Sequence, residues 1–182
     1  AKLSPAIRNT IPASIMYSST AALKPPLEAL CAEAGVTGTL LLAPEGINGT
    51  IAGKREGLDR VLDHLQGLPG CADLSWKEST ASEPPFRRMK VRLKREIVTM
   101  GQPGVDPRGA VGRYVKPKDW NALITAPDVA VIDTRNDYEV EIGTFSGAID
   151  PETRSFGAFP EWWEQNRAAL EGKRIAMFCT GG

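Results

Sequence analysis

The chain has 182 residues, and its 22 basic and 22 acidic side chains give a formal net charge of zero. With 42% hydrophobic and 24% charged residues, its composition is that of an ordinary globular protein, which excludes a disordered chain. No apolar run reaches the roughly 18–20 residues that a bilayer span needs, and the N-terminus lacks the order of a signal peptide. Three cysteines without CxxC spacing disfavour a disulfide framework and a structural zinc site. We therefore expect a cytoplasmic protein without a membrane partner.

The first half of the sequence predicts strands and helices in the order β-α-β-β-α-β. Strands are expected at residues 11–17, 39–43, 48–52 and 72–77, with a turn at 44–49. One predicted helix begins at Pro25 and Pro26, where a missing N–H costs little, and ends at Gly35. The other helix carries an apolar stripe over residues 58–65. This order is typical of a ferredoxin-like α+β fold.

A strongly basic segment follows at residues 84–118, where ten basic and two acidic side chains give a local net charge of +8. Its clearest element is a predicted strand at residues 89–100, in which apolar residues alternate with Lys90, Arg92 and Lys94. A charge run is most often a solvated face. A flat row of cations also suits the phosphates of RNA, so we predict these three side chains as RNA-binding residues.

The rest of the sequence predicts a linker and a second domain. Residues 101–118 are rich in glycine, proline and basic side chains and are expected to be the linker. Helices are predicted at 117–124, 136–142 and 159–170, and strands at 129–134 and 174–178. Strands that alternate with helices predict a parallel α/β sheet. The expected domains are therefore residues 1–100 and 119–182.

The last predicted strand is followed by Cys179, Thr180, Gly181 and Gly182. In open α/β sheets, ligands bind outside the carboxyl ends of the strands. Backbone N–H groups of a glycine-rich turn also favour a thiolate. We predict Cys179 as the catalytic residue and the three residues after it as its active-site loop. The alternative is a buried structural cysteine, the role that we expect for Cys31 and Cys71.

Three stretches around this cysteine resemble a rhodanese domain: Val131–Glu139, Gly143–Asp150 and Phe178–Gly182. They contain an Asp-x-Arg motif at a strand end, a glycine-alanine turn and a strand that ends in the cysteine. The resemblance implies an α/β domain with Cys179 as the essential thiol. Asp133 and Arg135 are expected to pair in a supporting role. In the family the loop continues into an arginine and a helix, whereas this sequence ends at Gly182, so we expect the rhodanese-like domain to be truncated.

Longer stretches at Gly38–Gly53, Arg88–Gly101 and Asp119–Ile124 resemble the bacterial rhodanese-domain tRNA uridine hydroxylases. This resemblance implies an acylphosphatase-like, ferredoxin-fold first domain. It also implies 5-hydroxylation of the wobble uridine of tRNA, with molecular oxygen as co-substrate and tRNA as the partner. No other cofactor, no metal and no obligate protein partner is expected.

Two chemical routes are open for this reaction at Cys179. A thiolate could add to C6 of uridine and raise the electron density at C5, or a persulfide could relay oxidising equivalents. Two other functions remain as alternatives. One is a persulfide-forming sulfurtransferase, which is the rhodanese activity. The other is a non-catalytic RNA-binding module whose second domain is only a scaffold.

Overall fold

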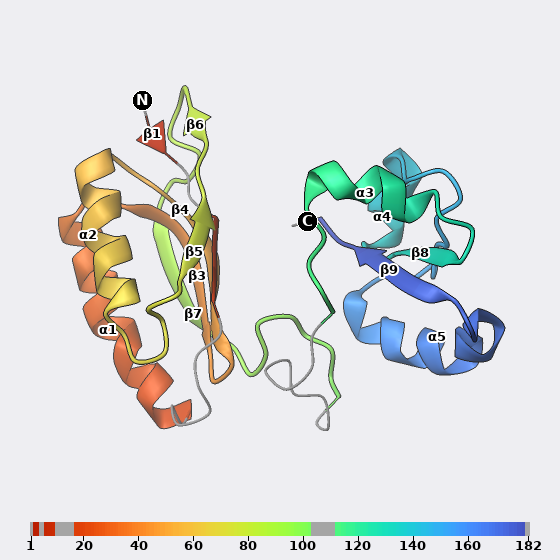
Figure 1. Ribbon diagram of the computed structural model, residues 1–182. Coiled ribbons are helices and arrows are strands. Elements are labelled where there is room, and N and C mark those ends of the chain that lie inside the picture. The colour runs from red at the N-terminus through yellow and green to blue at the C-terminus, as the bar shows by residue number, and fades with distance from the viewer. Residues whose placement is uncertain (1, 4–5, 10–16, 103–111, 181–182) are drawn as a thin grey trace. The chain divides into compact units, whose positions relative to one another are not determined.

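The computed structural model describes residues 2–3, 6–9, 17–102 and 112–180 (Figure 1). The chain divides into two compact units, Ala1–Ile97 and Val98–Gly182, called the first and the second unit below. The predicted linker at 101–118 falls within the second unit, and its residues 103–111 lie outside the described part. In the described part of the chain, no helix is both long and apolar enough to cross a bilayer.

A five-stranded sheet in the order β5-β2-β4-β3-β7 forms the centre of the first unit. Its strands are β2 (Ala6–Asn9), β3 (Thr37–Ala43), β4 (Gly46–Ala52), β5 (Ser75–Lys77) and β7 (Met89–Leu93). Neighbouring strands are antiparallel except β3 and β7, which are parallel. The short strands β1 (Lys2–Leu3) and β6 (Thr80–Ala81) pair separately. The predicted β-α-β-β-α-β order is thus present, and β7 extends the sheet at one edge.

Helices α1 (Tyr17–Glu33) and α2 (Arg55–Gln66) cover one face of this sheet (Figure 1). The stripe predicted for α2 is buried and consists of Leu58, Val61, Leu62 and Leu65. It packs in one core with Leu40 and other residues of β3, β4 and β7. Burying one such side chain contributes roughly 1.5–3 kcal/mol, so this core is the main source of stability of the first unit.

The structure differs from two predictions about the start of this unit. Helix α1 begins at Tyr17, so Pro25 and Pro26 lie inside it and not in its first turn. Because residues 21–24 are Ala, Ala, Leu and Lys, all strong helix formers, the helix extends upstream of the prolines. Of the strand predicted at 11–17, residues 11–16 lie outside the described part, and Tyr17 is helical. The first strand of the five-stranded sheet is instead β2.

Strand lengths also differ from the predictions. β7 ends at Leu93 and not at residue 100, because its neighbour β3 ends at Ala43 and leaves nothing further to pair with. Lys94 therefore lies just beyond the strand, where its N–H donates to the carbonyl of Leu42 at 2.8 Å. The predicted turn at 44–49 shrinks to Pro44 and Glu45, because β4 already begins at Gly46.

The second unit is built on two parallel strands, β8 (Val129–Asp133) and β9 (Arg174–Phe178). Helices α3 (Pro117–Ile124) and α4 (Asp137–Ile142) lie on the opposite side of these strands from α5 (Phe159–Asn166) (Figure 1). Short 3-10 helices, Phe156–Ala158 and Arg167–Leu170, flank α5. The predicted parallel pairing is present, and the bounds of α3 and β9 are those predicted.

Candidate functional site

The loops that follow β8 and β9 meet at one edge of the second unit. Asp133 and Phe178 are paired at the carboxyl ends of these strands. Just beyond them, the N–H and Oγ1 of Thr134 donate hydrogen bonds of 3.0 and 2.8 Å to the carbonyl oxygen of Phe178. These bonds hold the two loops together at the edge where open α/β sheets bind ligands. Cys179, the first residue after β9, lies at this edge.

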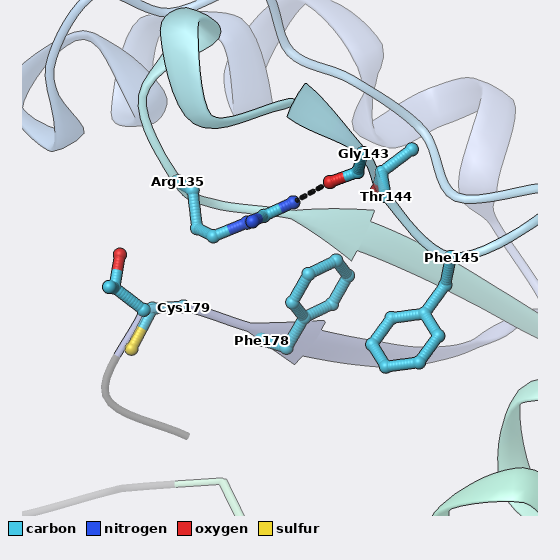
Figure 2. Close-up of a pocket in the computed structure, with 7 residues that line it drawn as sticks. Arg135, Gly143, Thr144, Phe145, Phe178 and Cys179 are labelled. Carbon is cyan, nitrogen blue, oxygen red and sulfur yellow. Dashed lines mark hydrogen bonds between the residues drawn. The ribbon is translucent and has the colours of Figure 1, made fainter. Parts of the chain in front are cut away.

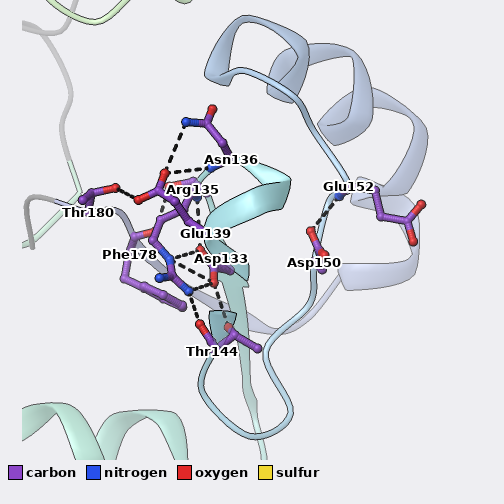
Figure 3. Close-up of polar contacts among 11 residues, drawn as sticks. Asp133, Arg135, Asn136, Glu139, Thr144, Asp150, Glu152, Phe178 and Thr180 are labelled. Atoms are coloured by element: carbon purple, nitrogen blue, oxygen red, sulfur yellow. Dashed lines mark hydrogen bonds and ion pairs between the residues drawn. The ribbon is translucent and has the colours of Figure 1, made fainter. Parts of the chain in front are cut away.

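The buried carboxylate of Asp133 organises the loop after β8 (Figure 3). Its oxygens accept hydrogen bonds from Nε (2.9 Å) and Nη2 (2.6 Å) of Arg135 and from Oγ1 of Thr144 (2.7 Å). Burial by itself would raise the pKa of Asp133, but the hydrogen bonds from Arg135 and Thr144 outweigh it and lower the pKa below its usual value. Asp133 is therefore held ionised as the anchor of Arg135.

Arg135 in turn connects this anchor to the next turn of the chain. Its Nη2 donates to the carbonyl oxygen of Gly143 at 2.6 Å. Its guanidinium carbon lies 5.4 Å from the centre of the Phe178 ring, which is a cation–π contact. With its Asp133 and Gly143 contacts, the guanidinium forms a rigid wall of the site rather than a free cation.

A second set of contacts holds the loop after β9. Glu139 in α4 accepts a hydrogen bond of 2.5 Å from Oγ1 of Thr180 on one oxygen, and the N–H of Asn136 donates to its other oxygen at 3.3 Å. The hydrogen bond from Thr180 is the largest cause that lowers the pKa of Glu139. Glu139 thus caps α4 and positions the residue next to Cys179.

These loops line an open pocket of about 430 Å³, a volume typical of small-ligand sites (Figure 2). Its lining residues are Arg135, Gly143, Thr144, Phe145, Phe178, Cys179 and Thr180. One wall is aromatic, with ring centres 4.9 Å apart for Phe145 and Phe178 and 5.7 Å apart for Trp120 and Phe145. Phe145 is 39% exposed. An exposed aromatic ring at the pocket suits the flat face of a base.

The three cysteines differ in accessibility. Cys179 is exposed, whereas Cys31 and Cys71 are buried in the core of the first unit. Burial raises the pKa of Cys31 to about 11 and also raises the pKa of Cys71. Figure 2 shows the sulfur of Cys179 turned away from the Arg135 guanidinium. Arg135 therefore shapes the pocket and does not contact the thiol.

The predicted site residues fall into two groups. The structure brings Cys179, Thr180, Asp133 and Arg135 together at one edge of the second unit. Gly181 and Gly182 lie outside the described residues. Lys90, Arg92 and Lys94 lie on or just after β7 in the first unit. Among the described residues, no ion pair involves any of these three cations.

Four residues of the site were not singled out as site residues by the sequence: Glu139, Thr144, Phe145 and Phe178. Glu139 follows Asn136 by three positions, which is the spacing of a capping box and a usable signal for its orientation. Thr144 and Phe145 carry no such local signal, because their role depends on the long-range contacts of the loop with Asp133 and with β9.

A family model matches most of the first unit. Residues 15–97 match the family described as UPF0176 acylphosphatase like domain, so the first unit contains an acylphosphatase-like domain. A solved acylphosphatase structure from Coxiella burnetii covers 50% of this chain and 90% of its own, with 13% identity and a TM-score of 0.34.

Curated relatives extend the match into the second unit. A protein from Roseobacter denitrificans is 68% identical over 166 residues, covering 91% of this chain and 56% of its own length. One from Gluconobacter oxydans is 64% identical over 170 residues, covering 91% of this chain and 54% of its own. Both are named tRNA uridine(34) hydroxylase, which confirms the resemblance predicted from the sequence. The chain spans about half the length of these relatives.

Proposed function

We propose that the full-length protein, meaning this chain with the remaining length that its relatives have, hydroxylates C5 of uridine 34 in tRNA. The observation that carries the proposal is the exposed Cys179, which lines a pocket with a volume typical of small-ligand sites. It is supported by identities of 60–68% to proteins named tRNA uridine(34) hydroxylase. Since tRNA is the substrate and the described thiols are free, we place the reaction in the cytoplasm.

In this proposal the second unit is a rhodanese-like domain and supplies the catalytic residue. Parallel strands with helices on both sides and a cysteine directly after β9 support this fold. The uracil ring of the substrate stacks on Phe145, while Arg135 and Phe178 form the fixed wall beside it. Asp133 and Glu139 are positioning residues, because they act through Arg135 and Thr180.

The reaction replaces the C5–H bond of uracil with C5–OH. The Cys179 thiolate adds to C6, which makes C5 an enolate carbon that attacks an oxygen at the peroxide level. Loss of the C5 proton and cleavage of the C6–S bond then restore the ring and the thiolate. One atom of O2 enters the base and the other leaves as water, so an external two-electron reductant supplies two electrons together with two protons.

In this proposal the first unit binds the RNA. Lys90, Arg92 and Lys94 have no carboxylate partner among the described residues and are available to phosphates. Binding through such contacts weakens steeply as salt rises, which separates it from binding by apolar contacts.

Nucleoside mass spectrometry tests the proposed function. Cells that lack the full-length protein are grown under ¹⁸O2 with and without a plasmid that restores it. We expect ¹⁸O-labelled 5-oxygenated uridine at position 34 only in the restored cells. An unchanged nucleoside profile would contradict the proposal. Thiosulfate-to-cyanide sulfur transfer by the purified protein, without any tRNA, would instead indicate a sulfurtransferase.

The stacking role of Phe145 has its own test in the same cells. Stacking of one base is worth about 1–3 kcal/mol, so Phe145→Ala should lower the rate of modification by roughly 5- to 150-fold. Tyr138, an exposed aromatic of α4 that does not line the pocket, provides the matched control. Equal effects of Phe145→Ala and Tyr138→Ala on the rate of modification would show that Phe145 does not stack on the substrate.

A further inference from the structure

One face of the five-stranded sheet in the first unit carries no described helix of that unit. Helices α1 and α2 both lie on the other face, where the buried core is (Figure 1). We call the first of these faces the open sheet face. Its side chains follow from the alternation along each strand, because the residues between the buried ones point to the opposite side.

The burial pattern identifies these side chains. In β3, Leu40 and Leu42 are buried, so Thr39 and Leu41 point to the open sheet face. In β7, Val91 is buried, which places Lys90 and Arg92 there. The same reasoning adds side chains of β4 and β5. Eight described residues of the open sheet face are used below: Thr39, Leu41, Asn48, Thr50, Ser75, Lys77, Lys90 and Arg92. Three of the eight are cations and none is acidic.

Strand register orders these residues into a row that crosses the whole sheet. Lys77 in β5 and Thr50 in β4 both pair with Ala6 of β2, which lies between them. Thr50 pairs with Thr39, and Thr39 with Lys90 of β7. Four strand-to-strand steps of about 4.8 Å put the two lysines roughly 19 Å apart, at opposite edges of the sheet. Hydroxyl groups lie between them.

Two carboxylates next to this row accept hydrogen bonds from groups outside the row. Glu78 follows Lys77, but it accepts hydrogen bonds from Arg55 of α2 at 2.6 and 3.0 Å and from the indole N–H of Trp76 at 3.0 Å. Glu45, in the turn between β3 and β4, accepts a hydrogen bond from the N–H of Ile97. Neither acid neutralises the cations of the open sheet face.

We propose that the open sheet face is the docking surface for the RNA backbone and that Lys77 is part of it. The proposal rests on tRNA being the substrate and adds a contact at the far edge of the sheet from β7. Cations at both edges hold phosphates, and the hydroxyl and amide side chains between them donate to phosphate and ribose oxygens. None of the eight residues is aromatic, so this face holds RNA by charge and shape and does not stack bases.

The salt dependence of RNA binding tests this surface. The full-length protein and its alanine variants are titrated with a fluorescent anticodon stem-loop RNA between 50 and 200 mM KCl. One lost phosphate contact should flatten the slope of log K against log salt by about 0.7–0.9, a roughly threefold effect over that range. We expect this change for Lys77→Ala as well as for Lys90→Ala and Arg92→Ala. The matched control is Lys24→Ala in α1, in the helix layer, and we expect it to leave the slope unchanged.

The outcomes separate this surface from the proposed function. If Lys77→Ala keeps the wild-type slope while Lys90→Ala and Arg92→Ala flatten it, RNA contacts only the β7 edge and the proposed surface is wrong. A slope that Lys24→Ala flattens as much as Lys77→Ala also overturns it. If uridine 34 is not hydroxylated but Lys77→Ala still flattens the slope, the surface stands and the proposed function fails.

Discussion

Asp133→Asn is the substitution whose effect follows most directly from the geometry. The side chain of Asp133 is fully buried, and that of Arg135 is 19% exposed. Asparagine has nearly the same size, but it replaces one acceptor oxygen with an NH2 group that faces the donors of Arg135. Breaking a buried ion pair costs about 3–5 kcal/mol, and we expect the low end, about 3 kcal/mol, because Arg135 retains some solvent contact.

Asp128→Asn is the matched control. Asp128 and Arg174 form the same two-bonded contact, at 2.7 and 3.0 Å, but their side chains are 55% and 59% exposed. Exposed pairs contribute little, so this variant should unfold almost as the wild type does. The two pairs share residue types and the Nε and Nη2 donors, so the comparison measures burial together with the further hydrogen bonds that Asp133 accepts from Thr144 and from the N–H of Arg135.

Urea unfolding followed by tryptophan fluorescence measures the difference in stability between the two variants. Trp120 reports on this region, since its ring centre lies 6.1 Å from that of Phe178. A loss of about 3 kcal/mol with a slope near 1.5 kcal/mol per molar urea moves the midpoint down by about 2 M. Folding lowers the pKa of Asp133, so its contribution is present above its ordinary value of 3.8 and is lost as the pH falls through the folded-state pKa. Asp133→Asn should therefore weaken the acid dependence of stability in this range. Equal midpoint shifts in both variants would contradict a larger contribution from the buried Asp133–Arg135 pair.

Two further predictions concern packing and thiol access. Gly49→Ala should lower the melting temperature of the first unit by roughly 10 °C, because the added Cβ would lie 2.2 Å from the carbonyl oxygen of Thr39; overpacking of this kind costs about 1–3 kcal/mol. Gly112→Ala, with nothing within 4 Å of its Cβ, is the control, and equal melting temperatures would count against the close β3–β4 approach. In native protein, a thiol reagent at pH 8 should label only the exposed Cys179, while urea should also release the buried thiols. Labelling of all three cysteines without denaturant would contradict the described core.

Local patterns in the sequence predict some elements well. The bounds of α3 and β9, and the buried stripe of α2, follow from apolar periodicity and from proline and glycine at the element ends. The length of β7 does not follow from such local patterns, because it is set by the point at which the neighbouring strand β3 ends. The start of α1 differs from the prediction, because the helix formers before Pro25 and Pro26 extend the helix upstream of the prolines.

In the candidate site, too, some positions follow from the local sequence and others depend on long-range contacts. The position of Cys179 directly after a strand could be predicted, because the apolar run of β9 lies next to it in sequence. Thr144 and Phe145 reach the pocket only through contacts with β8 and β9, and no pattern at their own position indicates this. The position of Lys77 on the open sheet face also could not be predicted from the local sequence, because it depends on the pairing of β5 with β2.

We propose above that Cys179 carries out the hydroxylation of uridine 34. The most direct measurement is nucleoside mass spectrometry of tRNA from cells in which the full-length protein is replaced by its Cys179→Ser or Cys71→Ala variant. We predict that Cys179→Ser abolishes 5-oxygenated uridine at position 34, while Cys71→Ala, expressed to the same level, retains it. Wild-type amounts of the modified nucleoside with Cys179→Ser would contradict the claim.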